Sequence, residues 1–152
     1  MTVVFQSYRQ GDVPDWIARC MRSVRDWASA AVHDYRFYDD EIFERVPDWY
    51  RAKCGDYPQI ATDLGRLVLA RELLADGAPA VIWLDADVLV FDAAAMVIDL
   101  SQGYAFGRER WVEPDRKAGW RTRRNVHNAV AAFATGNPML EFYIHAATRI
   151  ME

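Results

Sequence analysis

Two aspartates one residue apart, Asp85 and Asp87, interrupt a short apolar run. The residues before them, Val81–Leu84, predict a strand that is buried on both faces of a sheet. Because charge is expensive inside such a strand, both carboxylates are expected at its C-terminal end, where open α/β sheets bind ligands. The spacing of two sends both side chains roughly the same way. Two such oxygen donors suit a hard divalent cation that is shared with a phosphate.

Asp63 and Arg66 form a second candidate pair. They are three residues apart in a helical pattern, so they share one face of the helix. In one interpretation they form a surface ion pair worth less than about 1 kcal/mol. In the other, Asp63 accepts hydrogen bonds from a sugar hydroxyl and Arg66 contacts phosphate or sugar oxygens.

Other polar side chains stand at predicted strand ends. Gln6-Ser7-Tyr8 follows the first strand and is either a simple strand terminus or an aromatic and amide shelf for a nucleotide base. Asn128 can reach a carbohydrate or be satisfied within a turn. The three histidines, His33, His127 and His145, are too scattered along the sequence to define a metal site.

The elements that must position these residues alternate between strands and helices. Apolar runs and turn signals predict strands over 3–5, 32–38, 81–84, 104–107 and 126–133. Helices are predicted after Pro14, over 59–76 with Gly77 just past the end, and after Pro138. The apolar face of the first helix comprises Trp16, Ile17, Cys20, Met21, Val24, Trp27 and Ala28. This alternation predicts an α/β sheet with parallel pairing at its centre.

A polar segment from Arg108 to Arg124 contains seven basic residues and two tryptophans, and is interpreted as a loop. One interpretation is a mobile flap that closes over a diphosphate, with Arg side chains on the phosphates and Trp111 or Trp120 stacking on a ring. The other is a solvated loop whose arginines balance its acidic residues.

Length and composition predict one domain spanning residues 1–152. The net charge of −4 does not favour general binding to nucleic acid. No segment has the roughly 20 apolar residues of a transmembrane span. Cys20 and Cys54 fit no zinc spacing and are expected to be buried, reduced thiols of a cytoplasmic protein.

Together these residues resemble the GT-A glycosyltransferases with a DXD motif, of the α-1,6-mannosyltransferase and toxin-glucosyltransferase kind (family 32 type). Leu84–Val88 is similar to their Y-L-D-x-D motif, and Thr62–Arg66 to their S-D-x-x-R helix, with Thr for Ser. Val4–Tyr8 matches the first strand, which lines the nucleotide site. Tyr38–Asp40 resembles a W-D-D step with Tyr for Trp, and 128–142 resembles an N…G-H-P segment with Asn137 for His.

The resemblance implies a GT-A (Rossmann-like) nucleotide-diphospho-sugar transferase fold with a mixed, mostly parallel central sheet flanked by helices. It implies hexosyl transfer from a nucleotide-diphosphate sugar, with retention of configuration, to an unidentified glycan, lipid or protein acceptor. It implies that Asp63, Arg66 and Asp87 are catalytic, and that Asp85 and Asp87 hold a metal cofactor, Mn²⁺ or Mg²⁺. The donor-binding residues it implies are Phe5, Gln6, Tyr8, Asp63, Arg66, Asp85 and Asn128.

Two alternatives stay open at this point. Such transferases normally continue past this point into acceptor-binding elements, so a sugar-nucleotide-binding protein without turnover is the first alternative. The second is a phosphatase of the haloacid dehalogenase type, in which Asp85 would be the nucleophile. Those enzymes need a later lysine, and Lys117 is the only lysine that follows the D-x-D sequence.

Overall fold

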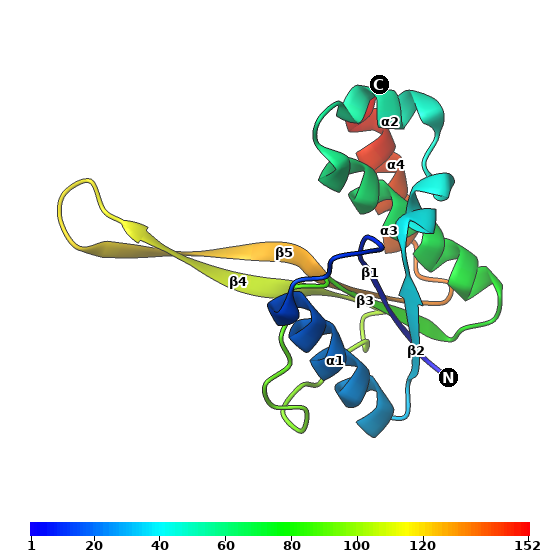
Figure 1. Cartoon of the computed structure of the whole chain (residues 1–152), viewed down its shortest axis with the longest axis horizontal. Helices are drawn as coiled ribbons and strands as arrows, with labels where there is room; N and C mark the ends of the chain where they lie inside the picture. The colour runs from blue at the N-terminus through cyan, green and yellow to red at the C-terminus, as the bar shows by residue number, and fades with distance from the viewer.

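The computed structural model describes all 152 residues and contains five strands, four α-helices and one 3₁₀-helix (Figure 1). In chain order these are β1 (Val3–Ser7), α1 (Asp15–Ala30), β2 (Asp34–Tyr38), η1 (Asp40–Arg45), α2 (Asp48–Cys54), α3 (Pro58–Ala75), β3 (Ala80–Leu84), β4 (Tyr104–Pro114), β5 (Trp120–Ala134) and α4 (Met139–Met151).

The five strands form one mixed sheet in the order β2-β1-β3-β5-β4. β1 pairs in parallel with both β2 and β3, whereas β5 pairs antiparallel with both β3 and β4. The expected parallel centre is therefore confirmed for β2-β1-β3, but a mostly parallel sheet is not, because two of the four pairings are antiparallel. The chain leaves β1 for β2 on one side and later returns to β3 on the other. The strand order thus reverses between β1 and β3, which is where open α/β sheets form ligand crevices.

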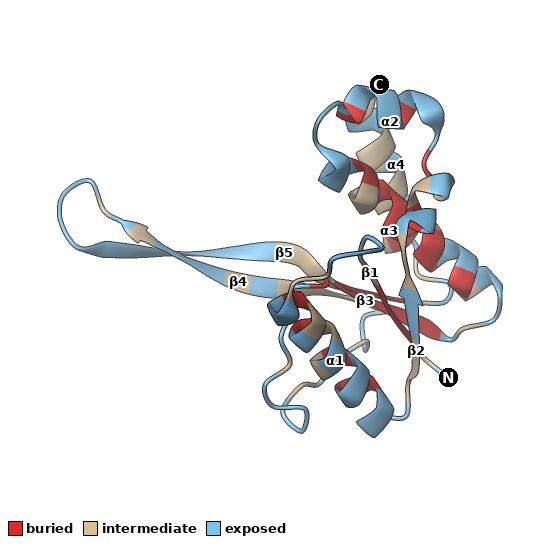
Figure 2. Cartoon of the chain, in the orientation of Figure 1, coloured by how far each residue is buried: buried red, intermediate tan, exposed pale blue.

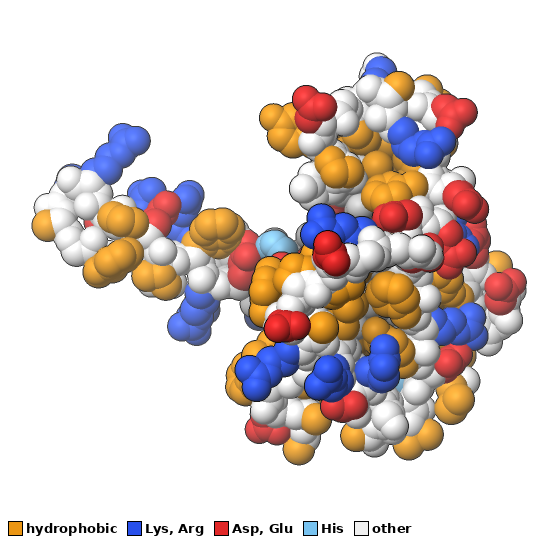
Figure 3. All heavy atoms as spheres, viewed as in Figure 1, with side chains coloured by type: hydrophobic (Ala, Val, Ile, Leu, Met, Phe, Trp, Pro, Cys, Tyr) orange, Lys and Arg blue, Asp and Glu red, His pale blue; other side chains and the backbone are white.

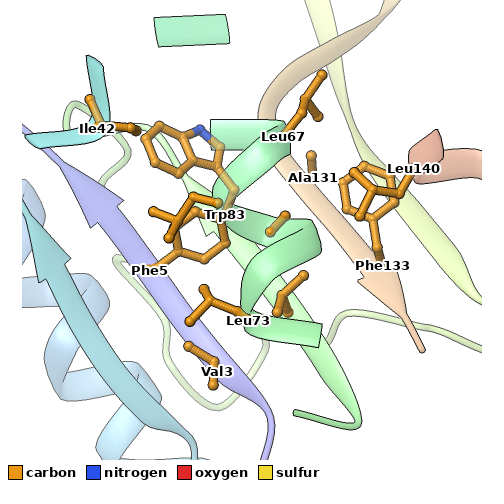
Figure 4. Packing of buried hydrophobic residues seen from close by; sticks show 12 residues of the cluster. Val3, Phe5, Ile42, Leu67, Leu73, Trp83, Ala131, Phe133 and Leu140 are labelled. Carbon is orange, nitrogen blue, oxygen red and sulfur yellow. The ribbon is translucent and has the colours of Figure 1, made fainter. Parts of the chain in front are cut away.

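Alternate residues of the central strands bury opposite faces of the sheet. Val4 and Ile82 face α1, together with the buried Val24 and Trp27 of that helix. Phe5 and Trp83 face the other way, toward α3 (Figure 4). Figure 1 shows α1 on one side of the sheet and α3 with α4 on the other. Burial on both faces explains why the central strands are almost continuously apolar (Figure 2).

Helix α3 runs alongside η1 and ends as the sequence predicts. Gly77 has φ +97°, and its amide donates to Leu74 O while that of Ala78 donates to Leu73 O, which is a Schellman cap. Within the helix, a Cβ added at Gly65 would lie 2.8 Å from Ile42 O of η1. Glycine at this position therefore lets η1 approach the helix closely.

The segment from Arg108 to Arg124 is not a loop. It belongs to β4 and β5, which pair antiparallel from Gly107–His127 to Pro114–Trp120. We call residues 107–127 the arm. Figure 1 shows the arm projecting from the body of the sheet, and Figure 2 shows that it is almost entirely exposed. Because neither face is buried, its sequence lacks the apolar alternation that predicts strands.

The other elements follow the predictions with small corrections. Trp16 was expected on the apolar face of α1 but is exposed, while Ile17, Cys20, Val24, Trp27 and Ala28 are buried there as expected. Cys20 and Cys54 are buried free thiols. None of the helices has the length and apolar character needed to cross a bilayer.

Candidate active site

The two aspartates lie where the sequence places them, in the turn directly after β3. Asp85 begins the turn: its amide donates to Ala129 O of β5 at 2.8 Å, and its carbonyl accepts from the Val88 amide at 3.1 Å. The carboxylate of Asp87 is exposed and has no hydrogen-bond or ion-pair partner in the protein. Asp87 is therefore free to bind a ligand.

Arg66 of α3 joins the two candidate pairs. Its Nη1 donates to Asp85 Oδ1 at 2.8 Å, and its Nη2 forms a short ion pair with Asp63 Oδ1. The side chain is only 4% exposed, and its guanidinium lies 5.3 Å from the centre of the Trp83 ring. The interpretation of Asp63 and Arg66 as a surface ion pair is therefore wrong, because Arg66 is buried between two carboxylates.

Burial is the main reason that the pKa of Asp85 is raised above its ordinary value. The nearby carboxylates of Asp87 and Asp63 also favour its protonated form, while Arg66 and the hydrogen bond from Trp83 favour the ionised form. Trp83 Nε1 donates to Asp85 Oδ1 at 2.5 Å. Oδ1 is thus occupied by two donors from the protein, which leaves Oδ2 for a ligand.

The first strand supports this turn from behind. Gln6 is fully buried, and its Nε2 donates to Asp85 O at 3.0 Å while its Oε1 accepts from the Tyr35 hydroxyl at 3.0 Å. Phe5 is also fully buried and packs edge-on against Trp83, with ring centres 5.2 Å apart. Both residues were expected to bind the donor; the structure places them behind the ligand-facing surface, where they hold the turn.

A cleft of about 330 Å³ opens beside the turn, between the C-terminal ends of β1 and β3 and the first half of α3. Of the expected donor-binding residues, it is lined by Tyr8, Asp63, Arg66 and Asp85, and also by Asp87. Asp40, from the step that resembles W-D-D, lines it too, as do Arg9 and Trp83, for which no role was predicted. Arg9 directly follows Tyr8 at the end of β1, so the sheet-end argument applied to Tyr8 could have found it.

Carboxylates outnumber cations in the cleft. Its lining contains four aspartates and two arginines, so its formal charge is −2 with all six ionised: Asp40, Asp63, Asp85, Asp87, Arg9 and Arg66. Arg66 is already paired with two of the aspartates. A phosphate entering this cleft alone would meet a net negative charge.

Asn128 lies at the edge of the cleft because of an irregularity in β5. The register of β5 against β4 jumps from Ala131, opposite Phe106, to His127, opposite Gly107, so residues 128–130 bulge out of the ladder. Asn128 Nδ2 is 3.4 Å from Asp63 Oδ1 and 3.4 Å from the hydroxyl of Tyr143 on α4. The structure thus brings Asn128 to the Asp63 side of the site.

The protein has no group of three or more His, Cys, Asp or Glu side chains that could hold a metal ion. Asp85 and Asp87 offer one free oxygen and one free carboxylate, respectively. This donor set is too small to enclose a cation, but it suits one that is completed by water and phosphate oxygens, as is common for Mg²⁺.

The arm does not reach this cleft. None of its residues is among the lining residues, so the structure does not form the flap of the first interpretation. Arg108, Glu109 and His127 at the base of the arm border a separate hollow, which Asp85 and Asp87 also line.

No family model and no curated protein matches this sequence. Among solved structures, a similar one is a glycosyltransferase involved in the glycosylation of the major capsid of PBCV-1, with a TM-score of 0.56 and 13% sequence identity. The match covers 97% of this chain and 66% of that one, so this chain spans just under two thirds of that protein's length. At this identity the likeness shows a shared fold.

Proposed function

We propose that this protein is a GT-A-type glycosyltransferase that takes its sugar from a nucleotide-diphosphate donor. The observation that carries the proposal is the linked set of Asp63, Arg66 and Asp85 beside the free Asp87, in a cleft at the reversal of strand order. The fold shared with a glycosyltransferase is consistent with it.

The charge of the cleft supports dependence on a divalent cation. With four aspartates against two arginines, the cleft favours a diphosphate only when a cation lies between them. We assign Asp87 and the free Oδ2 of Asp85 as ligands of Mn²⁺ or Mg²⁺, with donor phosphates completing the shell. When bound, the ion would stabilise the negative charge that develops on the departing diphosphate.

The other side chains have separate roles in this proposal. Arg66 is buried and already paired, so we assign it to positioning Asp63 and Asp85 rather than to direct contact with the phosphates. Arg9 is the guanidinium of the cleft that has no carboxylate partner, and it is suited to contact the diphosphate. Asp63, which is half exposed, would orient the transferred sugar through its hydroxyls. We assign no protein base, in keeping with retention of configuration.

The phosphatase alternative receives no support from the geometry. The lysine it requires would be Lys117, which lies at the tip of the arm, and no lysine lines the cleft. Binding of a sugar nucleotide without transfer remains the rival hypothesis, and an assay of turnover separates the two.

The test is calorimetric titration of UDP and GDP with and without Mn²⁺. We expect one nucleotide to bind at least about tenfold more weakly without Mn²⁺, and to lose a similar factor in Asp87→Asn. Asp56→Asn is the matched control, because Asp56 is exposed, has no partner in the protein and lies outside the cleft; it should bind as the wild type does. A nucleotide affinity that is the same in Asp87→Asn as in the wild type would overturn the proposal.

Hydrolysis of the matching nucleotide sugar then tests catalysis. A transferase is expected to release nucleoside diphosphate slowly in the absence of an acceptor, and Asp87→Asn should abolish this release. Metal-dependent binding with no release, with or without added acceptors, would instead favour the rival hypothesis of binding without transfer.

A further inference from the structure

A second hollow of about 530 Å³ lies between the base of the arm and α4. Six of its eight lining residues are apolar, and Phe106, Met139, Phe142 and Tyr143 contribute most of the large side chains. Phe106 and Tyr143 pack edge to face, with ring centres 5.8 Å apart. The hollow is therefore an aromatic surface with a preformed shape.

The apolar side chains at the rim of this hollow are left open to solvent. Phe142 is 63% exposed although it lies in a helix that has a buried side, and Val126 at the base of the arm is exposed as well. An exposed cluster of large apolar side chains around a hollow is typical of a ligand site.

The polar end of the hollow adjoins the nucleotide cleft. Asn128 lines the hollow and donates at 3.4 Å to Asp63 Oδ1, which belongs to the cleft. Asn128 also lies 3.4 Å from the Tyr143 hydroxyl, on the side of the hollow. One amide side chain thus forms the boundary between the two spaces.

His127 supplies the second polar group of the hollow. Its Nδ1 accepts from the Ala129 amide at 2.9 Å, so in the neutral ring the hydrogen is on Nε2. The ring therefore has no free acceptor, and its Nε2 lies 3.7 Å from Glu109 Oε2 at the base of the arm. Because both ring nitrogens face groups of the protein, Asn128 is the polar group of the hollow that faces the cleft.

We propose that this hollow is the acceptor subsite, and that the acceptor is a glycoside with an alkyl or aromatic group beside the hydroxyl that is glycosylated. This inference rests on the proposed transferase function. The apolar group would lie against Phe142 and Met139, and the hydroxyl would point past Asn128 toward the cleft. In the transfer, the acceptor oxygen bonds to the anomeric carbon as the bond from that carbon to the diphosphate breaks. The bonding electrons leave with the nucleoside diphosphate, and the hydroxyl proton passes to solvent.

The first test needs no donor and no activity. Protein with ¹³C-labelled methionine methyl groups is titrated with octyl β-D-glucopyranoside below its micellar concentration, and with methyl β-D-glucopyranoside for comparison. We expect the Met139 resonance, assigned by Met139→Leu, to shift saturably with the octyl glycoside and not with the methyl glycoside. The resonance of Met21 on α1 should stay unchanged. No saturable shift of Met139, or an equal shift with the methyl glycoside, would overturn the proposal.

Two variants of α4 localise the binding. Phe142→Ala should weaken octyl glycoside binding at least fivefold. Ile150→Ala changes an 83% exposed apolar residue of the same helix outside the hollow, and it should bind as the wild type does. Equal weakening by both variants would contradict a defined site.

Nucleotide titration separates the two proposals. If Mn²⁺ and nucleotide bind through Asp87 but Met139 does not respond to the octyl glycoside, the acceptor subsite is wrong and the transferase proposal stands. If Met139 responds but no nucleotide binds, the hollow is an apolar site unrelated to transfer, and the acceptor assignment fails with the proposed function. In an active enzyme, Phe142→Ala should raise KM for the octyl acceptor and leave KM for the donor unchanged.

Discussion

The cleft and the arm both carry many charged side chains, but they hold them in opposite ways. In the cleft, ion pairs and hydrogen bonds join residues far apart in sequence: Arg66 pairs with Asp85, whose carbonyl in turn accepts from Gln6. In the arm, Glu113 pairs with Arg121 and Arg123 across one two-stranded ladder. The cleft pairs are therefore part of the tertiary fold, whereas those of the arm are local.

The arm also has an uneven surface. Residues 107–127 contain seven basic and three acidic residues, a net charge of +4 in a chain whose net charge is −4. Figure 3 shows basic and apolar side chains side by side along it. The contrast with the cleft indicates that substitutions in the arm change the surface, while substitutions in the cleft change both the site and the fold.

The largest effect is expected from Arg66→Met. It removes the buried cation and leaves Asp63 and Asp85 unpaired, so the free energy of unfolding should fall by about 3 kcal/mol. Arg123→Met is the matched change in the arm; its exposed ion pair is worth less than about 1 kcal/mol. Urea denaturation measures both. Equal losses in the two variants would remove the distinction between the regions.

A smaller effect is expected from Gly65→Ala. The added Cβ would lie 2.8 Å from the Ile42 carbonyl oxygen, so η1 must move away from α3, at a cost of roughly 1–3 kcal/mol. Thr122→Ala in the exposed arm should change stability by no more than about 0.5 kcal/mol. A Gly65→Ala protein as stable as the Thr122→Ala protein in urea would show that η1 is not closely held.

The third prediction concerns pH. Because burial raises the pKa of Asp85, the folded state binds this proton more tightly than the unfolded state. Asp85 therefore favours the folded state below its raised pKa, and this contribution is lost as pH rises through that pKa. Urea denaturation from about pH 4 to pH 7, where an ordinary Asp near pKa 3.9 is mostly ionised, should show this fall in the wild type and not in Asp85→Asn. Coincident profiles would contradict it.

The same pKa direction predicts how the metal should bind. Since a carboxylate ligand must be ionised, Mn²⁺-dependent nucleotide affinity should fall as pH decreases through the raised pKa of Asp85. Calorimetry over the same pH range measures this, and affinity that stays constant would oppose a role for Asp85 as a ligand.

The smallest effect is expected from shortening the arm. Replacing residues 109–125 by Asn-Gly would close the ladder with a two-residue turn after the Arg108–Val126 pair. We expect nucleotide affinity within twofold of the wild type, because no arm residue lines the cleft, and little change in unfolding free energy. A large loss of affinity would show that the arm serves the cleft, as in the flap interpretation.

The parts of the fold that the sequence predicted are those governed by local patterns. The apolar run before Asp85 predicted a buried strand and the position of both carboxylates at its end. The periodic apolar residues of α3 and Gly77 predicted that helix and its cap to within a residue.

The features of the fold and the site that the sequence did not predict depend mainly on contacts between distant segments. Arg66 is three residues from Asp63, which suggested a surface pair, but its burial results from Asp85 and Trp83 on a strand reached later in the chain. The position of Asn128 depends on the bulge in β5, for which a single sequence gives no signal. The arm was missed because a ladder exposed on both faces needs no apolar alternation.

The bulge at residues 128–130 also separates a part of β5 whose pairing is fixed from a part whose length can vary. On one side of the bulge, β5 pairs with β3, and the buried core fixes the register of that pairing. On the other side, the arm is a regular two-stranded ladder. Removing or adding one residue in each strand of the arm would turn the side chains beyond that point to the opposite face of the ladder. Removing or adding two residues in each strand preserves their faces. Each such step changes the reach of the arm by about 7 Å without moving the Asp85 turn. A series of related proteins or engineered variants can therefore differ in the length of the arm while keeping the same sheet, helices and cleft.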